Sequence, residues 1–445
     1  MKILFISLGC DKNLADSEEM LGLLTGSGHE IVDSEEEAEA IVINTCCFIH
    51  DAKEESVNTI LEMAEYKKTG KCKALVVTGC MAQRYKEEIT QEIPEVDAVL
   101  GTTSYGDIVK ALNEVQAGHV FQEFRDINEL PEDSGRRVLT TGGHFGYLKI
   151  AEGCDKHCTY CIIPSLRGSF RSVPEERLLA QAEYMASQGV KELILVAQET
   201  TVYGTDLYGR KTLHILLKKL CQIRGIRWIR VLYCYPEEIY DELIQVMKEE
   251  KKICNYLDLP IQHASDRILK RMGRRTTRKQ LTDIITKLRR EIPDIVLRTS
   301  LITGFPGETQ EDHEELMEFV DEMEFDRLGV FTYSPEEGTP AETMEGQVPE
   351  EVKEERRDEI MSLQQEISLE KGNERIGQEL LVMIEGKVSG ESAYIGRTYA
   401  DAPKVDGYLF VQTGELLVTG DFARVRVTGA LEYDLIGELA DEYTE

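Results

Sequence analysis

Short apolar runs alternate with amphipathic stretches along the first 118 residues of the chain. Four runs rich in aliphatic and β-branched residues predict strands, at 2–7, 40–44, 74–78 and 98–100. Apolar residues at helical spacing predict helices between them, over 15–25, 52–68 and 82–92. Strands that alternate with helices are typical of a parallel sheet covered on both faces. The pattern therefore predicts a doubly wound α/β domain.

The same alternation returns between residues 144 and 335. Six further runs predict strands, at 147–151, 192–197, 229–232, 256–259, 296–302 and 329–332. Each run ends in polar residues, Gly or Pro. In a parallel β/α barrel such strand ends share one mouth, which is the face where these barrels bind ligands. We therefore expect a partly closed, TIM-like β/α barrel with a site at that mouth.

The pattern changes again after the barrel. Residues 349–372 are highly charged with apolar residues at helical spacing, which predicts a connecting helix. From there to about residue 439, short runs with Gly at the turns predict the strands of a small β-barrel, at 380–384, 408–412 and 422–428. The polar segment 131–135 reads as a linker. We expect three domains, at 1–118, 133–368 and 372–440.

Composition narrows the class of protein. The chain has 445 residues, a net charge of -31 and no apolar run near the about 20 residues of a membrane span. Nucleic-acid binding draws on Lys and Arg, so this acidity favours a basic partner, unless it only keeps the protein soluble. Eleven cysteines without a secretion signal indicate reduced thiols and metal ligation. We therefore expect a cytoplasmic protein with no membrane partner.

Three of the cysteines stand close together in the sequence. Cys154, Cys158 and Cys161 have the spacing C-x3-C-x2-C. Three thiolates on one loop can hold three corners of an iron-sulfur cube and leave one iron open to a small molecule. Zinc sites usually show four ligands in paired knuckles, and a bacterial ferredoxin needs a C-x2-C-x2-C-x3-C-P run that is absent. The triplet therefore indicates a chemical site rather than an electron carrier.

Three more cysteines each follow a predicted strand of the first domain: Cys10, Cys46 and Cys80. The carboxyl ends of parallel strands meet at one edge of a sheet, where ligands bind. These residues are either a second three-thiolate set or structural, and their identical strand-end position favours the cluster. The other cysteines lie in or near apolar segments, or next to Cys46, and are expected to be structural: Cys47, Cys72, Cys221, Cys234 and Cys254.

The motifs together resemble one enzyme family. They are Ser-Leu-Gly-Cys-Asp-Lys-Asn (7–13), Asn-Thr-Cys (44–46), Thr-Gly-Cys (78–80), the cysteine loop through Arg167-Gly168, Pro-Ile-Gln-His (260–263) and Thr-Gly-Phe-Pro-Gly-Glu-Thr (303–309). Over nearly its whole length the chain resembles methylthiotransferases of the radical S-adenosylmethionine (SAM) superfamily. Its C-terminal barrel resembles a TRAM domain.

Two branches of that family compete. One modifies an adenosine of transfer RNA, and the other methylthiolates an aspartate side chain of ribosomal small-subunit protein twelve. Residues 12–18 and 397–407 resemble the protein-modifying branch. The charge agrees, because residues 373–445 carry 6 Lys/Arg and 14 Asp/Glu, a net charge of -8 that suits a basic protein better than RNA. We expect the ribosomal protein as substrate and nucleic acid not to be one.

The resemblance implies two 4Fe-4S clusters and SAM. Cys154, Cys158 and Cys161 would hold the cluster that cleaves SAM, and the other triplet would hold a second cluster that presents the sulfur. No side-chain base can remove hydrogen from an unactivated carbon, so the chemistry must come from cofactors. A flavodoxin-type reductant is implied. The one basic run, at 274–279, could meet that reductant, the acidic first domain or ribosomal RNA.

Candidates for SAM contacts are groups at the barrel mouth. They are Tyr160, Gln198, Glu199, Gln262, Arg298 and Gly304. Arg298 would suit a carboxylate and Glu199 an ammonium group. Each of these residues could instead brace a loop, and Gly304 could serve a turn or a close approach of backbone to ligand.

Overall fold

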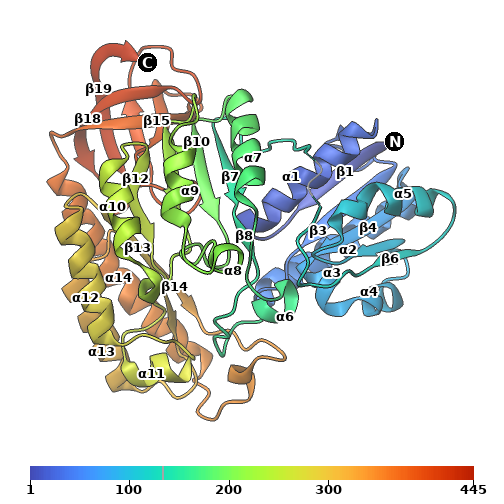
Figure 1. Cartoon of the computed structure of the whole chain (residues 1–445), viewed down its shortest axis with the longest axis horizontal. Helices are drawn as coiled ribbons and strands as arrows, with labels where there is room; N and C mark the ends of the chain where they lie inside the picture. Colours follow the sequence, from blue (N-terminus) through green and yellow to red (C-terminus); the bar gives the residue numbers. More distant parts are fainter. Residues whose placement is uncertain (133–134, 445) are drawn as a thin grey trace.

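The chain begins with a six-stranded parallel sheet, at the right of Figure 1. A computed structural model describes residues 1–132 and 135–444, so Asp133 and Ser134 of the predicted linker lie outside the described residues. The strands run in the order β2-β1-β3-β4-β5-β6. Their bounds are β1 Lys2–Ser7, β2 Glu30–Val32, β3 Ala40–Thr45, β4 Ala74–Gly79, β5 Ala98–Leu100 and β6 Phe121–Glu123.

Helices cover both faces of this sheet. They are α1 Asp11–Gly26 and α5 Ile108–Gln116 on one face, with α2 His50–Thr69, α3 Cys80–Tyr85 and α4 Glu87–Glu92 on the other. Successive strand residues point to opposite faces, so each face has its own core. Ile41 packs toward Ile60 of α2, while Val42 joins Met20 of α1. The doubly wound prediction is confirmed.

Two local predictions for this domain were incomplete. The strands β2 and β6 were not expected, because each has three residues and lies at an edge of the sheet. The helix predicted over 82–92 is two helices, α3 and α4. They separate at Lys86, whose φ of 45° does not belong to a right-handed helix.

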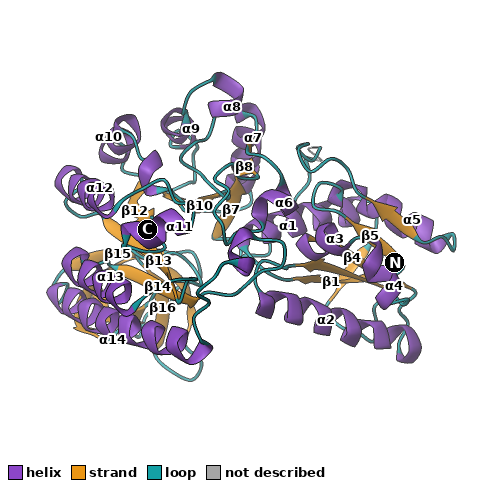
Figure 2. Cartoon of the chain, turned by 90° about the horizontal axis from the view of Figure 1, so that it is seen from below, coloured by secondary structure: helices purple, strands orange, loops and turns teal. Residues whose placement is uncertain are grey.

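The central unit is a second parallel sheet, in the order β7-β10-β11-β12-β13-β14. Its strands are β7 Phe145–Lys149, β10 Glu192–Val196, β11 Trp228–Val231, β12 Ile253–Asp258, β13 Val296–Thr303 and β14 Arg327–Thr332. Figure 2 shows helices around the outer side of this sheet. They include α7 Glu175–Ser187, α9 Leu213–Leu220, α10 Asp241–Glu249, α12 Arg278–Glu291 and α13 Gln310–Met323. The six predicted strands are all present, and the partial barrel is confirmed.

Shorter elements connect the strand ends of this unit. A two-stranded antiparallel ribbon, β8 Ala151–Glu152 with β9 Arg171–Ser172, flanks the loop of the clustered cysteines. The short helices are α6 Ile163–Arg167, α8 Thr205–Tyr208 and α11 Asp266–Arg271. Within the described residues, no helix combines the length and the apolar character needed to cross a bilayer.

The C-terminal unit is a closed five-stranded barrel, reached through the long helix α14 Glu350–Glu374. Its strands are β15 Glu379–Lys387, β16 Ala393–Arg397, β17 Leu409–Gln412, β18 Phe422–Ala430 and β19 Leu435–Thr444. The small barrel was predicted, but β16 and β19 were not. It packs against the amino ends of the central strands, where the ring of Trp228 meets Phe422 edge-on at 4.9 Å.

Buried charges fix the small barrel to the central sheet. Glu192 accepts hydrogen bonds of 2.8 Å from both Arg230 and Arg397, and all three side chains are fully buried. The loop 398–406 continues this contact, because Asp401 pairs with Arg327 at 2.5 Å. Such a set is stable only while every charge keeps its partner.

A second buried network joins the first domain to the central sheet. Lys149 at the end of β7 pairs with Asp16 of α1 and with Glu152. Arg167 of α6 donates to Asp16 at 2.8 Å and to Asn13 at 3.0 Å. Because these groups are almost fully removed from water, α1 has one favoured position against the cysteine loop and the edge of the central sheet.

Replacing Glu192 by Ala should lower the free energy of unfolding by about 3–5 kcal/mol, because two buried guanidinium groups lose their shared counter-charge. Trp228, the one tryptophan of the chain, lies where the small barrel packs against the central sheet. Its fluorescence therefore follows the separation of these two units during guanidinium unfolding. The control is Asp283→Ala, which removes an exposed i,i+4 pair with Lys279 worth about 0.5 kcal/mol. Equal unfolding midpoints for the two variants would contradict the prediction.

Candidate active site

The first cysteine triplet lies on the loop between β8 and α6, at the carboxyl end of β7. Cys154 and Cys158 are buried and Cys161 is partly buried. Gly153 starts the loop with a φ of 75°, and an added Cβ would lie 2.1 Å from the carbonyl oxygen of Ser169. Glycine is therefore required at this position. Burial, with a contribution from Cys158, raises the pKa of Cys154 to about 11 and that of Cys161 to about 12.

The second triplet collects at the carboxyl edge of the first sheet. Cys10 follows β1, Cys46 follows β3 and Cys80 follows β4, and these three strands are neighbours. A Cβ on Gly9 would approach the Sγ atom of Cys46 to 3.0 Å, so glycine allows the two loops to meet. Burial, followed by the nearby Cys80 thiol, raises the pKa of Cys46 to about 11. The fold thus brings together three thiols that are distant in sequence.

The donor sets fit iron-sulfur cubes better than single metal ions. Within the described ranges, no three His, Cys, Asp or Glu side chains converge on a point where one ion could bind. A cube has a different requirement, since each thiolate binds its own iron atom. Each triplet supplies three thiols and no fourth, so an open iron would remain at both sites.

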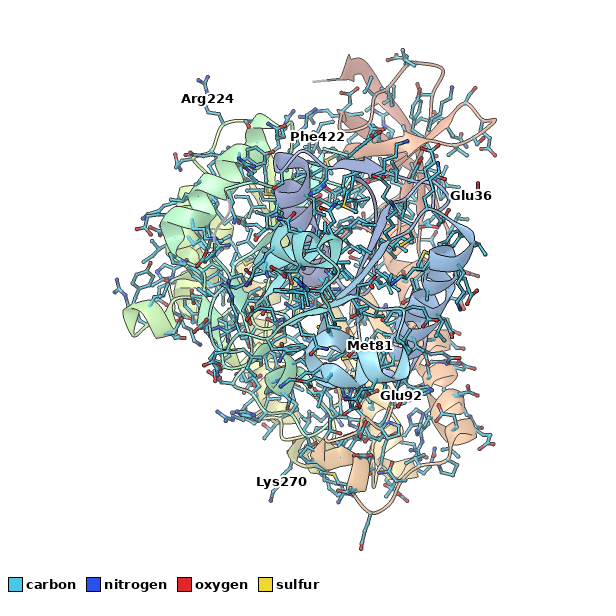
Figure 3. All side chains as sticks on the ribbon, turned by 90° about the vertical axis from the view of Figure 1, so that its right-hand side faces the viewer. Glu36, Met81, Glu92, Arg224, Lys270 and Phe422 are labelled. Carbon is cyan, nitrogen blue, oxygen red and sulfur yellow. The ribbon has the colours of Figure 1, made fainter. Side chains whose placement is uncertain are left out.

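Both triplets face the contact between the first domain and the central sheet. Arg167, six residues after Cys161, interacts electrostatically with the thiol of Cys80 in the other domain. Tyr233, just after β11, donates to Asp11 at 3.0 Å, next to Cys10. In Figure 3, Met81 beside Cys80 lies far from Phe422 of the small barrel. The site is therefore at the opposite end of the central sheet from that barrel.

Two predicted SAM-contact residues carry unused acceptor atoms at the barrel mouth. Glu199 is buried, and one of its oxygens accepts a hydrogen bond from the backbone N–H of Thr201 at 3.0 Å. The other oxygen is buried and has no hydrogen-bond partner within the described part of the chain, and the same holds for Oε1 of Gln198. Burial raises the pKa of Glu199 to about 7, although the hydrogen bonds from Thr201 act in the opposite direction. Glu199 also interacts electrostatically with Cys154.

Tyr160 and Gln262 also lie at this mouth. The Tyr160 hydroxyl interacts electrostatically with Cys158, and the Tyr160 ring meets Phe305 edge-on at 6.3 Å. Gln262 has a φ of 70°, a strained value for a residue with a side chain. Its backbone is held by Ser300 and Ile302 of β13. Strain of this kind persists where the surroundings impose it, which is common at functional sites.

Arg298 and Gly304 contact other elements of the chain, and their predicted role in SAM binding stays a prediction. Arg298 donates a hydrogen bond to Asp258 at 2.8 Å and lies 3.5 Å from Asp406 of the loop 398–406. Two carboxylates of the chain therefore already interact with its guanidinium. Gly304 lies against α14, where an added Cβ would be 2.1 Å from Lys353. In the structure both residues serve packing between elements.

Several residues near the site had no role assigned from the sequence. Arg167 was noted only as part of a motif, and its partner Asp16 is 151 positions away. His263 is fully buried, and its Nδ1 accepts the backbone N–H groups of Ala264 and Ser265. Tyr235 lies with its hydroxyl 3.7 Å from the Sγ of Cys158. Of these residues, only Arg167 and His263 lie in motifs that the sequence analysis named, which are the cysteine loop through Arg167-Gly168 and the Pro-Ile-Gln-His segment.

Family models match each of the three units. Residues 2–101 match uncharacterized protein family UPF0004, residues 148–320 match the radical SAM superfamily and residues 376–440 match the TRAM domain. Among solved structures, the chain resembles the radical SAM methyltransferase TsrM from Kitasatospora setae, with a TM-score of 0.55 and 13% identity over 77% of each chain. The cobalamin-dependent radical SAM enzyme OxsB gives a TM-score of 0.52 and 13% identity over 82% of this chain and 56% of that one. These likenesses concern the fold alone.

Relatives match from end to end. The chain is 64% identical over 437 residues to ribosomal protein uS12 methylthiotransferase RimO of Lachnoclostridium phytofermentans, covering 98% of this chain and 99% of the relative. It is 51% identical over 439 residues to RimO of Pelotomaculum thermopropionicum, with 98% and 99% coverage, and 50% identical over 445 residues to RimO of Clostridium botulinum, with 100% and 99% coverage. Together with the two facing cysteine triplets, these matches show that the chain belongs to the RimO-type ribosomal protein uS12 methylthiotransferases of the radical SAM superfamily.

Proposed function

We propose that this chain replaces a hydrogen on the β-carbon of an aspartate residue in ribosomal protein uS12 with a methylthio group. Cys154, Cys158 and Cys161 would hold the 4Fe-4S cluster that works with SAM, and Cys10, Cys46 and Cys80 a second one. The observation that carries this proposal is the position of both triplets on one interdomain face. A sulfur donor and a radical source are useful together only if one carbon can reach both.

The reaction requires more than side-chain chemistry. The hydrogen on an unactivated carbon is not acidic, so no carboxylate or imidazole of the chain can remove it. When bound, the two clusters and SAM would supply the radical that takes this hydrogen and the methylated sulfur that replaces it. The chain itself would bind and orient these groups and keep water away from them.

Named side chains would do this orienting. The unused oxygens of Glu199 and Gln198 are suited to accept hydrogen bonds from the ammonium group of SAM, since both are buried at the strand ends. Tyr160 lies against Cys158 and would limit solvent access to that cluster. Arg167 interacts electrostatically with Cys80 from the barrel side and would hold the second cluster at a fixed distance from the first.

Charge supports a protein substrate. The net charge of -31 would attract a basic ribosomal protein and repel a phosphate backbone, so we infer that nucleic acid is not the direct substrate. The cluster that works with SAM also needs electrons one at a time, and a flavodoxin-type protein is a reductant of that class. A ribosomal substrate and eleven free thiols agree with a cytoplasmic location.

The decisive experiment is anaerobic incubation of reconstituted enzyme with SAM, dithionite, sulfide and purified uS12. Mass spectrometry of uS12 peptides should show one methylthio group in place of one hydrogen on an aspartate. A transfer RNA anticodon stem-loop, treated in parallel, should stay unmodified. An unmodified aspartate with a methylthiolated adenosine would reverse the assignment and identify the chain as a transfer RNA enzyme.

The neighbouring pair Cys46 and Cys47 offers a matched test of the second cluster. Cys46→Ala should lose the iron of one cluster and make no methylthiolated product, yet still release 5′-deoxyadenosine from SAM, because the first triplet is untouched. Cys47→Ala should retain both clusters and both activities, since Cys47 is fully buried, whereas Cys46 and Cys80 keep some exposed surface. The opposite pattern would make Cys47 the ligand.

Glu199 predicts a pH dependence of SAM binding. An ammonium group binds the ionised carboxylate, and a pKa of about 7 means that Glu199 becomes protonated as the pH falls. Affinity should therefore drop about tenfold between about pH 8 and pH 6 in the native protein, by anaerobic calorimetry. Glu199→Gln should bind weakly with no such drop. The exposed Glu183→Gln should behave as the native protein, and a drop retained in Glu199→Gln would refute the assignment.

A further inference from the structure

Arg274 lies directly behind the first cysteine triplet. It follows α11 and Gly273, on a segment that braces the cysteine loop. The backbone N–H of Thr159, which stands between Cys158 and Cys161, donates to the carbonyl of Met272 at 2.9 Å. The Thr159 hydroxyl donates to the carbonyl of Arg271, also at 2.9 Å. The position of Arg274 relative to the thiols is thus set by the backbone of both segments.

The guanidinium of Arg274 is buried with unused donors. Its side chain is 1% exposed, and Nη2 donates to the carbonyl of Pro260 at 2.8 Å. Nε and Nη1 are buried and have no hydrogen-bond partner among the residues that the structure describes. The nearest carboxylate oxygen, on Glu237, is 4.0 Å from Nη2, which is too far for a hydrogen bond. A buried cation with two unmet N–H groups is costly, so an acceptor is expected there.

The side chains that contact Arg274 also lie next to the cysteines of the first triplet. Its guanidinium carbon lies 4.2 Å from the ring centroid of Tyr235, whose hydroxyl is 3.7 Å from the Sγ of Cys158. Arg274 also interacts electrostatically with Tyr160 and Cys158 themselves. The Arg274 cation therefore stacks on the ring of Tyr235. It is also close enough to interact electrostatically with Cys158, whose sulfur would carry negative charge as a cluster ligand.

Arg274 differs from the other cations of its basic run. Arg278 pairs with Glu318 and Glu322 at 3.0 Å, on the outer surface, and Arg275 is exposed. A residue needed only to hold the carbonyl of Pro260 would use one N–H group. The run is therefore split between a surface part and one inward cation.

We propose that Arg274 is a positioning residue for the cluster on Cys154, Cys158 and Cys161, whose two unused N–H groups donate to that cluster or its thiolates and whose charge makes the cluster easier to reduce. The inference rests on the proposed function, because it presumes a cluster on this triplet. Reduction adds one electron, from an external one-electron donor, to a centre that three thiolates already make negative. A nearby cation and hydrogen bonds to sulfur stabilise the reduced form and raise the reduction potential.

The test uses the full-length chain with Cys10, Cys46 and Cys80 all replaced by Ala, so that one cluster is measured. In this background, Arg274→Gln removes the charge, Arg274→Lys keeps it, and Arg275→Gln is the matched surface control. Each reconstituted protein is titrated anaerobically with dithionite and followed by electron paramagnetic resonance, with iron content measured in parallel. Neither readout depends on turnover.

Arg274→Gln should make reduction at least tenfold less favourable, a fall in potential of about 59 mV for a one-electron couple. Arg274→Lys should retain most of the native potential, and Arg275→Gln all of it. The proposal is overturned if Arg274→Gln matches Arg275→Gln, or if Arg274→Lys shifts as far as Arg274→Gln.

Loss of the cluster is also informative. Iron lost from Arg274→Gln but kept in Arg274→Lys would support the role of the charge, whereas iron lost from both would make Arg274 a simple brace and refute the proposal. Failure of the background protein with native Arg274 to bind any cluster would instead count against the proposed function. The two failures are therefore distinguishable.

Discussion

The geometry of the molecule depends on charges buried between its first domain and its central sheet. Asp16, Lys149, Glu152 and Arg167 are almost completely removed from water, where an unpaired charge would cost several kcal/mol. Only an arrangement that pairs all of them is stable, so the two units cannot slide or rotate past each other without breaking the set. A hydrophobic interface of the same size would allow more freedom, because apolar contacts are not directional.

This constraint determines what the strand ends can do together. A parallel sheet brings its own carboxyl ends to one edge, but nothing in either sheet alone orients one edge toward the other. Arg167 does so, since it belongs to the helix that follows the first cysteine triplet, hydrogen-bonds Asp16 of α1 and interacts electrostatically with Cys80. Tyr233 makes a second such link through Asp11. Two cysteine triplets from separate domains are thereby held at one interdomain contact.

Local patterns predicted the elements and the cysteine triplets well, and long-range contacts poorly. Strands such as Lys2–Ser7 and Ala98–Leu100 have the predicted bounds, because buried parallel strands are continuous apolar runs. The strands β2 and β6 have three residues each, too few for a periodic signal. The contact between Arg298 and Asp406 could not be anticipated, because Asp406 lies 108 positions later, on the loop 398–406 of the C-terminal unit. Arg274 looked like part of a surface run, since sequence does not show which of several adjacent cations turns inward.

The raised pKa values of the cysteines have a consequence for maturation of the protein. Thiols such as Cys46 and Cys154, each with a pKa of about 11, hold their protons at neutral pH until iron displaces them. Loading one triplet must therefore release protons, and it becomes less favourable in acid. The same burial that would shield a bound cube from solvent thus keeps the thiols of the empty protein in the protonated, poorly nucleophilic form that resists oxidation.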